Sequence, residues 1–137
     1  NDMRDLEKAA EEGNERAKEA IDCYAYRVRK YIGAYAANLI KVDILVFTGG
    51  IGQNGWRMRE RICRRLENLG IFMDFTLNKE MGNREGIVSK AYSPITVAVI
   101  PTNEELQIAI DVYDLVYGKE NGFRRRHTDY NVGIKKN

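Results

Sequence analysis

The chain has 137 residues, of which 22 are Lys or Arg and 20 are Asp or Glu, so its formal net charge is +2. A charge this close to zero gives no field over the whole molecule for attracting nucleic acid or an anionic membrane. The hydrophobic fraction of 44% excludes a disordered chain, and no apolar run reaches the roughly 18 residues that a membrane-spanning helix needs. We expect about one domain, from a reducing compartment, with Cys23 and Cys63 buried and unreactive.

The first third of the chain has the pattern of two helices. Asp2 is suited to cap the first helix, because its carboxylate can accept hydrogen bonds from N–H groups that the first turn leaves unpaired. Gly13 is suited to end that helix and Asn14 to cap the next one. Apolar residues then recur every three or four positions over 17–39, which predicts a long amphipathic helix. Gly33 in its middle indicates a close packing contact or, as the alternative, a kink.

Residues 43–47 are a short, continuous run of strand-forming residues. Such a run is typical of a strand covered on both faces in a parallel sheet. The motif Gly49-Gly50-Ile51-Gly52 breaks the run, and a second amphipathic helix is predicted from about Asn54 to Asn68, with many of its arginines outward. Gly70 ends this helix. Its predicted inward positions are Met58, Ile62 and Leu66.

The second half of the chain completes an α/β pattern. Residues 71–90 are predicted as loops with one or two edge strands, and residues 95–100 as a second strand that Pro101 ends, because proline has no N–H to donate. Asn103 is suited to cap a third helix. This order predicts a mostly parallel central sheet flanked by helices. Residues 118–137 carry six basic and two acidic residues, and we expect a basic, flexible tail there.

The glycine motif is the sharpest local feature. Glycines between a buried strand and a helix allow a tight turn and a close approach of ligand to backbone, and a helix start suits a phosphate. The spacing matches neither a Walker A loop nor a dinucleotide fingerprint. From the residues alone, a phosphate or nucleotide site and a turn without a ligand remain equally open.

Three other segments each have a functional and a structural interpretation. Glu104 could hold Mg²⁺ through water, or could simply complement the dipole of the third helix. Asp2-Met3-Arg4 could face a base or ribose, or could form a cap and a surface ion pair. The stripe from Tyr24 to Tyr35 fits a core or a subunit interface. For the first two the structural interpretation is favoured by the local sequence.

Taken together, three segments resemble the C-terminal portion of the acetate kinase family. The resemblance runs from the first residue to about Tyr117, and it is specific in order and spacing. The segments that carry it are Asp2-Met3-Arg4-Asp5-Leu6, Val46-Phe47-Thr48-Gly49-Gly50-Ile51-Gly52-Gln53-Asn54 and Ile100-Pro101-Thr102-Asn103-Glu104-Glu105-Leu106.

The resemblance implies a fold, a reaction and a set of ligands. The fold is that of the acetate and sugar kinase/Hsp70/actin superfamily, with two ribonuclease-H-like lobes around a nucleotide cleft, and residues 1–117 would be most of the C-terminal, nucleotide-binding lobe. The reaction moves a phosphoryl group between ATP and acetate with Mg²⁺, making acetyl phosphate and ADP. Glu104 matches the family's magnesium-site glutamate. The expected nucleotide-binding residues are Asp2, Met3, Arg4, Gly50, Ile51, Gly52, Gln53 and Asn54.

The resemblance also leaves gaps. The family usually has Glu where Gln53 stands, and the tail after Gly118 does not resemble the family's ending. The N-terminal lobe, which supplies the catalytic arginines, the histidine and the acyl pocket, is absent, so we expect no catalytic residue here and an inactive fragment. The family's enzymes are cytoplasmic homodimers that pair through this lobe, and from the near-neutral charge we expect neither nucleic acid nor membrane as a partner. Propionate or butyrate kinase and a stand-alone nucleotide-binding module are the alternatives.

Overall fold

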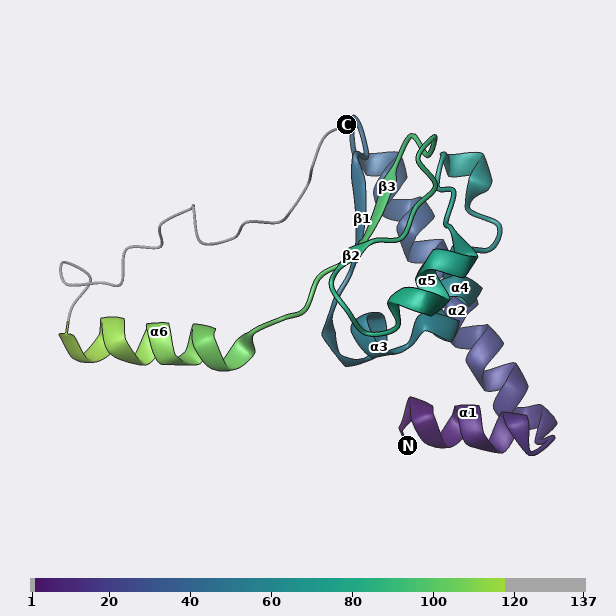
Figure 1. Cartoon of the computed structure of the whole chain (residues 1–137), viewed down its shortest axis with the longest axis horizontal. Coiled ribbons are helices and arrows are strands. Elements are labelled where there is room, and N and C mark those ends of the chain that lie inside the picture. The colour runs from purple at the N-terminus through teal and green to yellow at the C-terminus, as the bar shows by residue number, and fades with distance from the viewer. Residues whose placement is uncertain (1, 118–137) are drawn as a thin grey trace. The chain divides into compact units, whose positions relative to one another are not determined.

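The computed structural model describes residues 2–117, and the chain divides into two compact units, with the boundary in the sequence between Thr102 and Asn103. The second unit contains α6 (Glu104–Tyr117). No helix in the described part of the chain is long and apolar enough to cross a membrane. The predicted tail lies outside the described residues. The elements of the first unit are α1 (Met3–Glu11), α2 (Glu15–Asn38), β1 (Ile44–Phe47), α3 (Gly49–Asn54), α4 (Trp56–Cys63), η1 (Glu67–Leu69), α5 (Phe75–Met81), β2 (Gly86–Ile87) and β3 (Thr96–Val99) (Figure 1).

The predicted helix caps are confirmed. A side-chain oxygen of Asp2 accepts a hydrogen bond from the N–H of Arg4 at 3.0 Å, and Asn14 caps α2 by accepting from the N–H of Ala17 at 3.2 Å. In the second unit, Asn103 accepts from the N–H of Leu106 at 3.0 Å. Each cap satisfies a donor that a helix start leaves unpaired, so the sequence sets these starts locally.

The sheet brings the two predicted strands side by side. Its order is β1-β3-β2, with β1 parallel to β3 and β2 antiparallel to β3. Phe47 is paired with Val99, and the N–H of Ile100 donates to the carbonyl of Phe47 at 2.9 Å. The carboxyl ends of both strands therefore lie at the same edge, with α3 beyond the end of β1 (Figure 1). The expected cover on both faces is wrong for β1, because Ile44 and Val46 are exposed.

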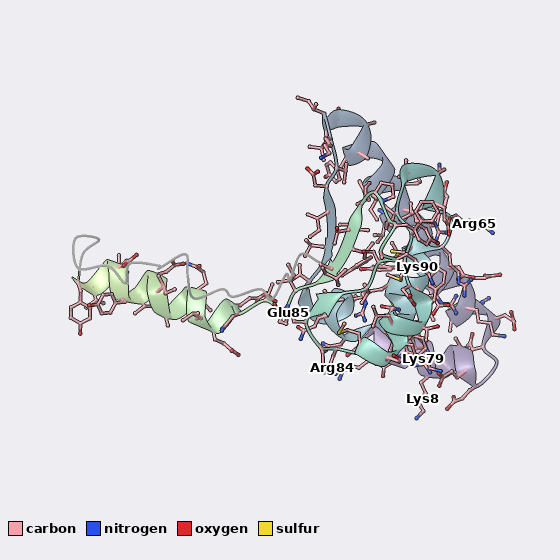
Figure 2. All side chains as sticks on the ribbon, turned by 45° about the horizontal axis from the view of Figure 1, so that its top comes forward. Lys8, Arg65, Lys79, Arg84, Glu85 and Lys90 are labelled. Atoms are coloured by element: carbon pink, nitrogen blue, oxygen red, sulfur yellow. The ribbon has the colours of Figure 1, made fainter. Side chains whose placement is uncertain are left out.

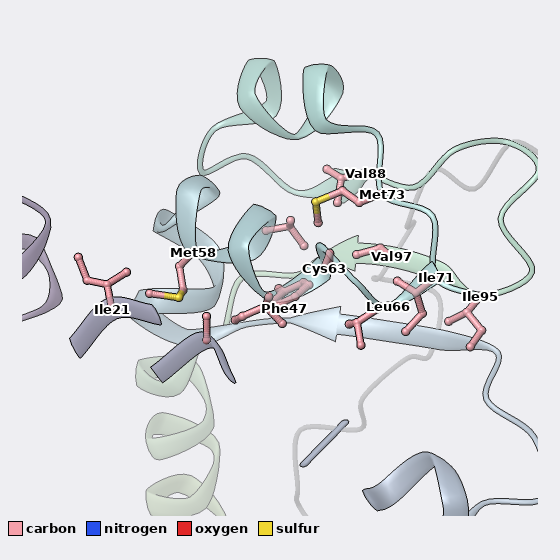
Figure 3. Packing of buried hydrophobic residues seen from close by; sticks show 13 residues of the cluster. Ile21, Phe47, Met58, Cys63, Leu66, Ile71, Met73, Val88, Ile95 and Val97 are labelled. Carbon is pink, nitrogen blue, oxygen red and sulfur yellow. The ribbon is translucent and has the colours of Figure 1, made fainter. Parts of the chain in front are cut away.

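The core lies between this sheet and helices α2 and α4 (Figure 3). The three positions predicted to point inward from the second helix, Met58, Ile62 and Leu66, are all buried. Only the first half of α2 contributes buried residues, since Tyr31 and Tyr35 are more than half exposed. The tyrosine stripe is therefore not core in this chain. The close contact expected at Gly33 is also wrong, because a Cβ there would meet no atom within 4 Å.

Two predicted segments differ from the structure. The helix predicted from about Asn54 to Asn68 is shorter: α4 runs from Trp56 to Cys63, and only the short η1 follows it. Before it lies the unpredicted α3, separated from α4 by Gly55, where a Cβ would lie 2.7 Å from the carbonyl oxygen of Ile51. The segment predicted as loops contains α5, because Asp74 caps a helical turn by accepting from the N–H of Leu77 at 3.0 Å.

The two cysteines have different environments. Cys63 is buried as expected, and burial raises the pKa of its thiol to about 12, so it stays protonated and unreactive near neutral pH. The expectation for Cys23 is wrong, because this residue is exposed on α2.

Arg65 has an unusual backbone conformation. Its φ is 74°, and it is the one residue other than glycine with positive φ in the described part of the chain. A Cβ in the left-handed region approaches the following carbonyl oxygen and costs roughly 1–2 kcal/mol. The turn after α4 therefore carries a side chain where glycine would be more stable.

We predict that Arg65→Gly raises the free energy of unfolding by about 0.5–1 kcal/mol, because the lost strain exceeds the added entropy of the unfolded chain. Arg65→Ala is the matched control: it removes the same charge but keeps the Cβ. Urea unfolding, followed by fluorescence of the single tryptophan, Trp56, measures both variants. Equal midpoints for the two variants would contradict the prediction.

Candidate functional site

A cleft of about 440 Å³ lies between the start of α1 and the glycine motif. Two segments that are far apart in the sequence form its walls. From the first segment the lining residues are Asp2, Met3, Arg4 and Glu7, and from the second they are Gly50, Ile51, Asn54 and Gly55. The structure thus brings together six of the eight residues that the resemblance implied for nucleotide binding.

The glycine motif is itself a short helix rather than a turn before a helix. It forms α3, and its glycines have separate roles. Gly49 has a φ of 68°, which lets the chain change direction after β1. A Cβ on Gly52 would lie 3.3 Å from the backbone carbon of Phe47, so α3 can approach the strand end closely. A Cβ on Gly50 would meet nothing within 4 Å, so this residue leaves open space in the cleft.

The start of α1 forms the charged wall of the cleft. Arg4 donates from Nε and Nη2 to Oδ2 of Asp2, at 3.0 and 2.5 Å, while the Asp2 carboxylate also caps the helix. These hydrogen bonds with Arg4 lower the pKa of Asp2 to about 2, so the pair stays ionised at any physiological pH. Both structural interpretations of this segment, cap and ion pair, are therefore realised. The Arg4 side chain is 87% exposed and remains accessible to a ligand.

Gln53 and Gly52 do not line the cleft. The Nε2 of Gln53 instead donates to the carbonyl of Asn83 at 3.3 Å, which ties α3 to the loop after α5. A carboxylate in its place has no N–H to make this bond. In the structure Gln53 therefore shapes the loop and does not face the cleft.

Arg59 is the functional residue of this region that the sequence analysis did not single out. Many arginines of this helix were expected to point outward, yet Arg59 is 0% exposed. Its position, between Met58 and Ile62 on the apolar face of α4, was the available signal. Burial lowers the pKa of its guanidinium, whose ordinary value is high enough that the group stays charged.

The buried guanidinium of Arg59 holds α3 in place. Its Nη1 donates to the carbonyls of Gly52 and Gln53 at 2.8 and 2.5 Å, and its Nη2 donates to the carbonyl of Gly82 at 2.6 Å. Carbonyls in the last turn of a helix have no partner within the helix, so Arg59 satisfies two of those of α3. Its Nε donates to Oδ1 of Asn78 at 2.8 Å.

Asn78 completes this network from α5. It is 0% exposed, and its Nδ2 donates to the carbonyl of Trp56 at 2.9 Å. The Arg59–Asn78 pair therefore connects α3 and α4 to α5, which lies in the segment that the sequence predicted as loops.

Comparison with known proteins identifies the family. The model of the acetokinase family matches residues 1–110. The chain belongs to this family. It is 53% identical over 114 residues to an acetate kinase of Geobacillus kaustophilus, over 83% of this chain and 28% of that protein. It is 49% identical over 116 residues to an acetate kinase of Campylobacter jejuni subsp. doylei, over 85% of this chain and 29% of that protein.

Solved structures of acetokinase family members agree with the fold. The crystal structure of Porphyromonas gingivalis acetate kinase has a TM-score of 0.77 and 46% identity, over 84% of this chain and 29% of that one. A propionate kinase from Francisella tularensis subsp. tularensis has a TM-score of 0.70 and 41% identity, over 79% of this chain and 27% of that one. The expected fold of the acetate and sugar kinase/Hsp70/actin superfamily is confirmed, for a chain that spans less than a third of these relatives.

Glu104, the expected magnesium ligand, lies in the first turn of α6 in the second unit, where it is exposed. Among the described residues it forms no ion pair, and no three or more His, Cys, Asp and Glu side chains come together as a metal site. A free carboxylate fits Mg²⁺ that keeps its waters and contacts substrate phosphates. It does not make a complete site by itself.

We predict that Arg59→Met lowers the free energy of unfolding by about 3–5 kcal/mol, because the carbonyls of Gly52, Gln53 and Gly82 stay buried without their donor. Arg64→Met is the control. Arg64 forms an exposed ion pair with Glu60, so its loss is expected to cost less than about 1 kcal/mol. Chemical denaturation of both variants measures the difference, and similar losses would show that the buried network does not stabilise this region.

Proposed function

We propose that this chain is the nucleotide-binding part of a kinase that transfers the phosphoryl group of ATP to acetate, giving acetyl phosphate and ADP. The observation that carries this proposal is the cleft in which Asp2, Met3 and Arg4 face Gly50, Ile51 and Asn54. The relatives named acetate kinase favour acetate as the acceptor. The similarity to a propionate kinase supports propionate, and by extension butyrate, as the alternative.

Each wall of the cleft suits one part of a nucleotide. The exposed guanidinium of Arg4 is planar and can lie against a base or ribose, while Asp2 holds it in position. Gly50 leaves room for a ligand against the backbone of α3, and Asn54 offers an exposed amide. Glu104 would take part in holding Mg²⁺, which neutralises phosphate charge when bound.

Catalysis needs more than this cleft. Phosphoryl transfer depends on holding donor and acceptor in line and on stabilising the charge of the transferring group. The residues of the cleft supply one cation, Arg4, which already pairs with Asp2. We therefore assign no catalytic residue to this chain and expect the acceptor pocket and the remaining cations elsewhere in the protein.

The exposed tyrosines of α2 support a homodimer, and the family resemblance favours the cytoplasm. Tyr31 and Tyr35 are stacked on each other, with ring centroids 6.3 Å apart, and are 56% and 67% exposed. Aromatic side chains of this kind are enriched in interfaces. Sedimentation velocity on the intact protein tests this: Tyr35→Glu is expected to shift a dimer to monomer, and a monomeric wild type would refute the dimer.

We predict that Gly50→Leu weakens ADP binding to the intact protein at least tenfold in isothermal titration calorimetry. The side chain would fill the cleft, yet folding should persist because a Cβ at Gly50 meets no atom within 4 Å and leucine is a better helix former than glycine. Ala20→Leu, at an exposed position of α2, is the matched control and should bind ADP normally. Unchanged ADP affinity in Gly50→Leu would exclude the cleft as the nucleotide site.

We also predict that the isolated 137-residue chain forms no acetyl phosphate from ATP, Mg²⁺ and acetate, because the residues of the cleft supply only one cation and no acceptor pocket. Trapping acetyl phosphate with hydroxylamine measures the product, and the intact protein is the positive control. Turnover by the isolated chain within the usual kinase range of roughly 1–100 s⁻¹ would contradict this division of roles.

A further inference from the structure

A second hollow, of about 580 Å³, lies on the first unit between α2 and α4, and it shares no lining residue with the nucleotide cleft. Its walls are strongly basic. Five arginines line it against two carboxylates, Asp22 and Glu60, although the whole chain is nearly neutral. The arginines are Arg29 from α2 and Arg57, Arg61, Arg64 and Arg65 from α4 and the turn after it.

The spacing of these arginines places them on one face. Arg57 and Arg61 are four residues apart within α4, so their side chains are neighbours on one face of the helix, while Arg65 lines the same hollow from the turn after α4. Like charges at this spacing destabilise a helix. The sequence therefore concentrates positive charge at some cost to stability.

The carboxylates of the hollow do not balance this charge. Asp22 pairs with Arg61 at 2.5 Å, and Glu60 pairs with Arg64. Arg57 pairs with Glu11, which lies outside this hollow, at 3.5 Å. The other two arginines, Arg29 and Arg65, have no carboxylate partner among the described residues. Arg29 donates to the carbonyl of Arg61, and Arg65 has neither a hydrogen bond nor an ion pair in that part of the chain.

Arg65 is also the residue whose backbone would be more stable with glycine, given its φ of 74°. Its cationic side chain is thus held beside the hollow at a backbone cost. Each wall thus has one guanidinium without a carboxylate partner, Arg29 from α2 and Arg65 from the turn after α4, and this pair fits an anion that bridges the two.

We propose that this hollow binds a small anion with two or more phosphoryl groups. The planar fork of a guanidinium matches phosphate oxygens with paired hydrogen bonds, and two such groups with an excess of positive charge suit a diphosphate. The volume is that of a small-molecule site rather than of a macromolecular interface. Because the two hollows share no residue, this proposal stands apart from the proposed function.

Pyrophosphate, added to the intact protein without Mg²⁺, is the probe, and isothermal titration calorimetry is the measurement. The double variant Arg29→Gln/Arg65→Gln is expected to raise the dissociation constant at least tenfold. Lys8→Gln/Arg84→Gln is the control; it removes the same charge at two surface positions outside the hollow and should change binding less than twofold (Figure 2).

Thermal melting tests whether each variant folds. If the double variant does not fold, the single variant Arg65→Gln replaces it and should weaken pyrophosphate binding about threefold. No heat from pyrophosphate with the wild-type protein overturns the proposal. An equal loss of pyrophosphate affinity in the control variant also overturns it, because the attraction would then be unspecific. Unchanged affinity in Arg29→Gln/Arg65→Gln overturns it too, because the anion would then bind elsewhere.

Discussion

The cleft depends on one buried cation. The guanidinium of Arg59 is 0% exposed and donates to three backbone carbonyls and to the side chain of Asn78. A charge that is removed from water is tolerated only when its donors are satisfied, and here the acceptors are carbonyls that the ends of α3 and α5 leave free. The hydrogen bonds that offset the cost of burying the Arg59 guanidinium also hold the glycine motif in position.

The parallel pairing of β1 and β3 sets the other boundary of the site. Because Phe47 lies opposite Val99, the carboxyl ends of β1 and β3 lie at the same edge of the sheet, and α3 follows β1 there. Ligands of open α/β sheets bind beyond the carboxyl ends of their strands. The start of α1 reaches this edge and supplies the second wall of the cleft, so residues near position 2 and near position 50 meet.

The sequence predicted what local chemistry determines. Asp2, Asn14 and Asn103 were identified as caps because a side-chain oxygen and the next few N–H groups suffice to make one. The helix α3 was missed because its three glycines disfavour a helix, and bonds from Arg59, seven residues after Gly52, stabilise it instead. The helix α5 was missed although Asp74 caps it locally, as Asp2 caps α1. Its one buried residue, Asn78, instead depends on the distant partner Arg59.

Arginine composition alone cannot separate structural from binding residues in α4. Arg59 differs from Arg57 and Arg61 by two positions, which is about 200° around a helix of 3.6 residues per turn. That rotation puts Arg59 with Met58 and Ile62 in the core and leaves the other two at the surface. Exchanging a surface arginine alters charge and little else, whereas exchanging Arg59 alters the position of α3. The angular position of each arginine around the helix, relative to the apolar stripe, therefore decides whether that arginine affects the shape of the cleft or only the charge of the surface.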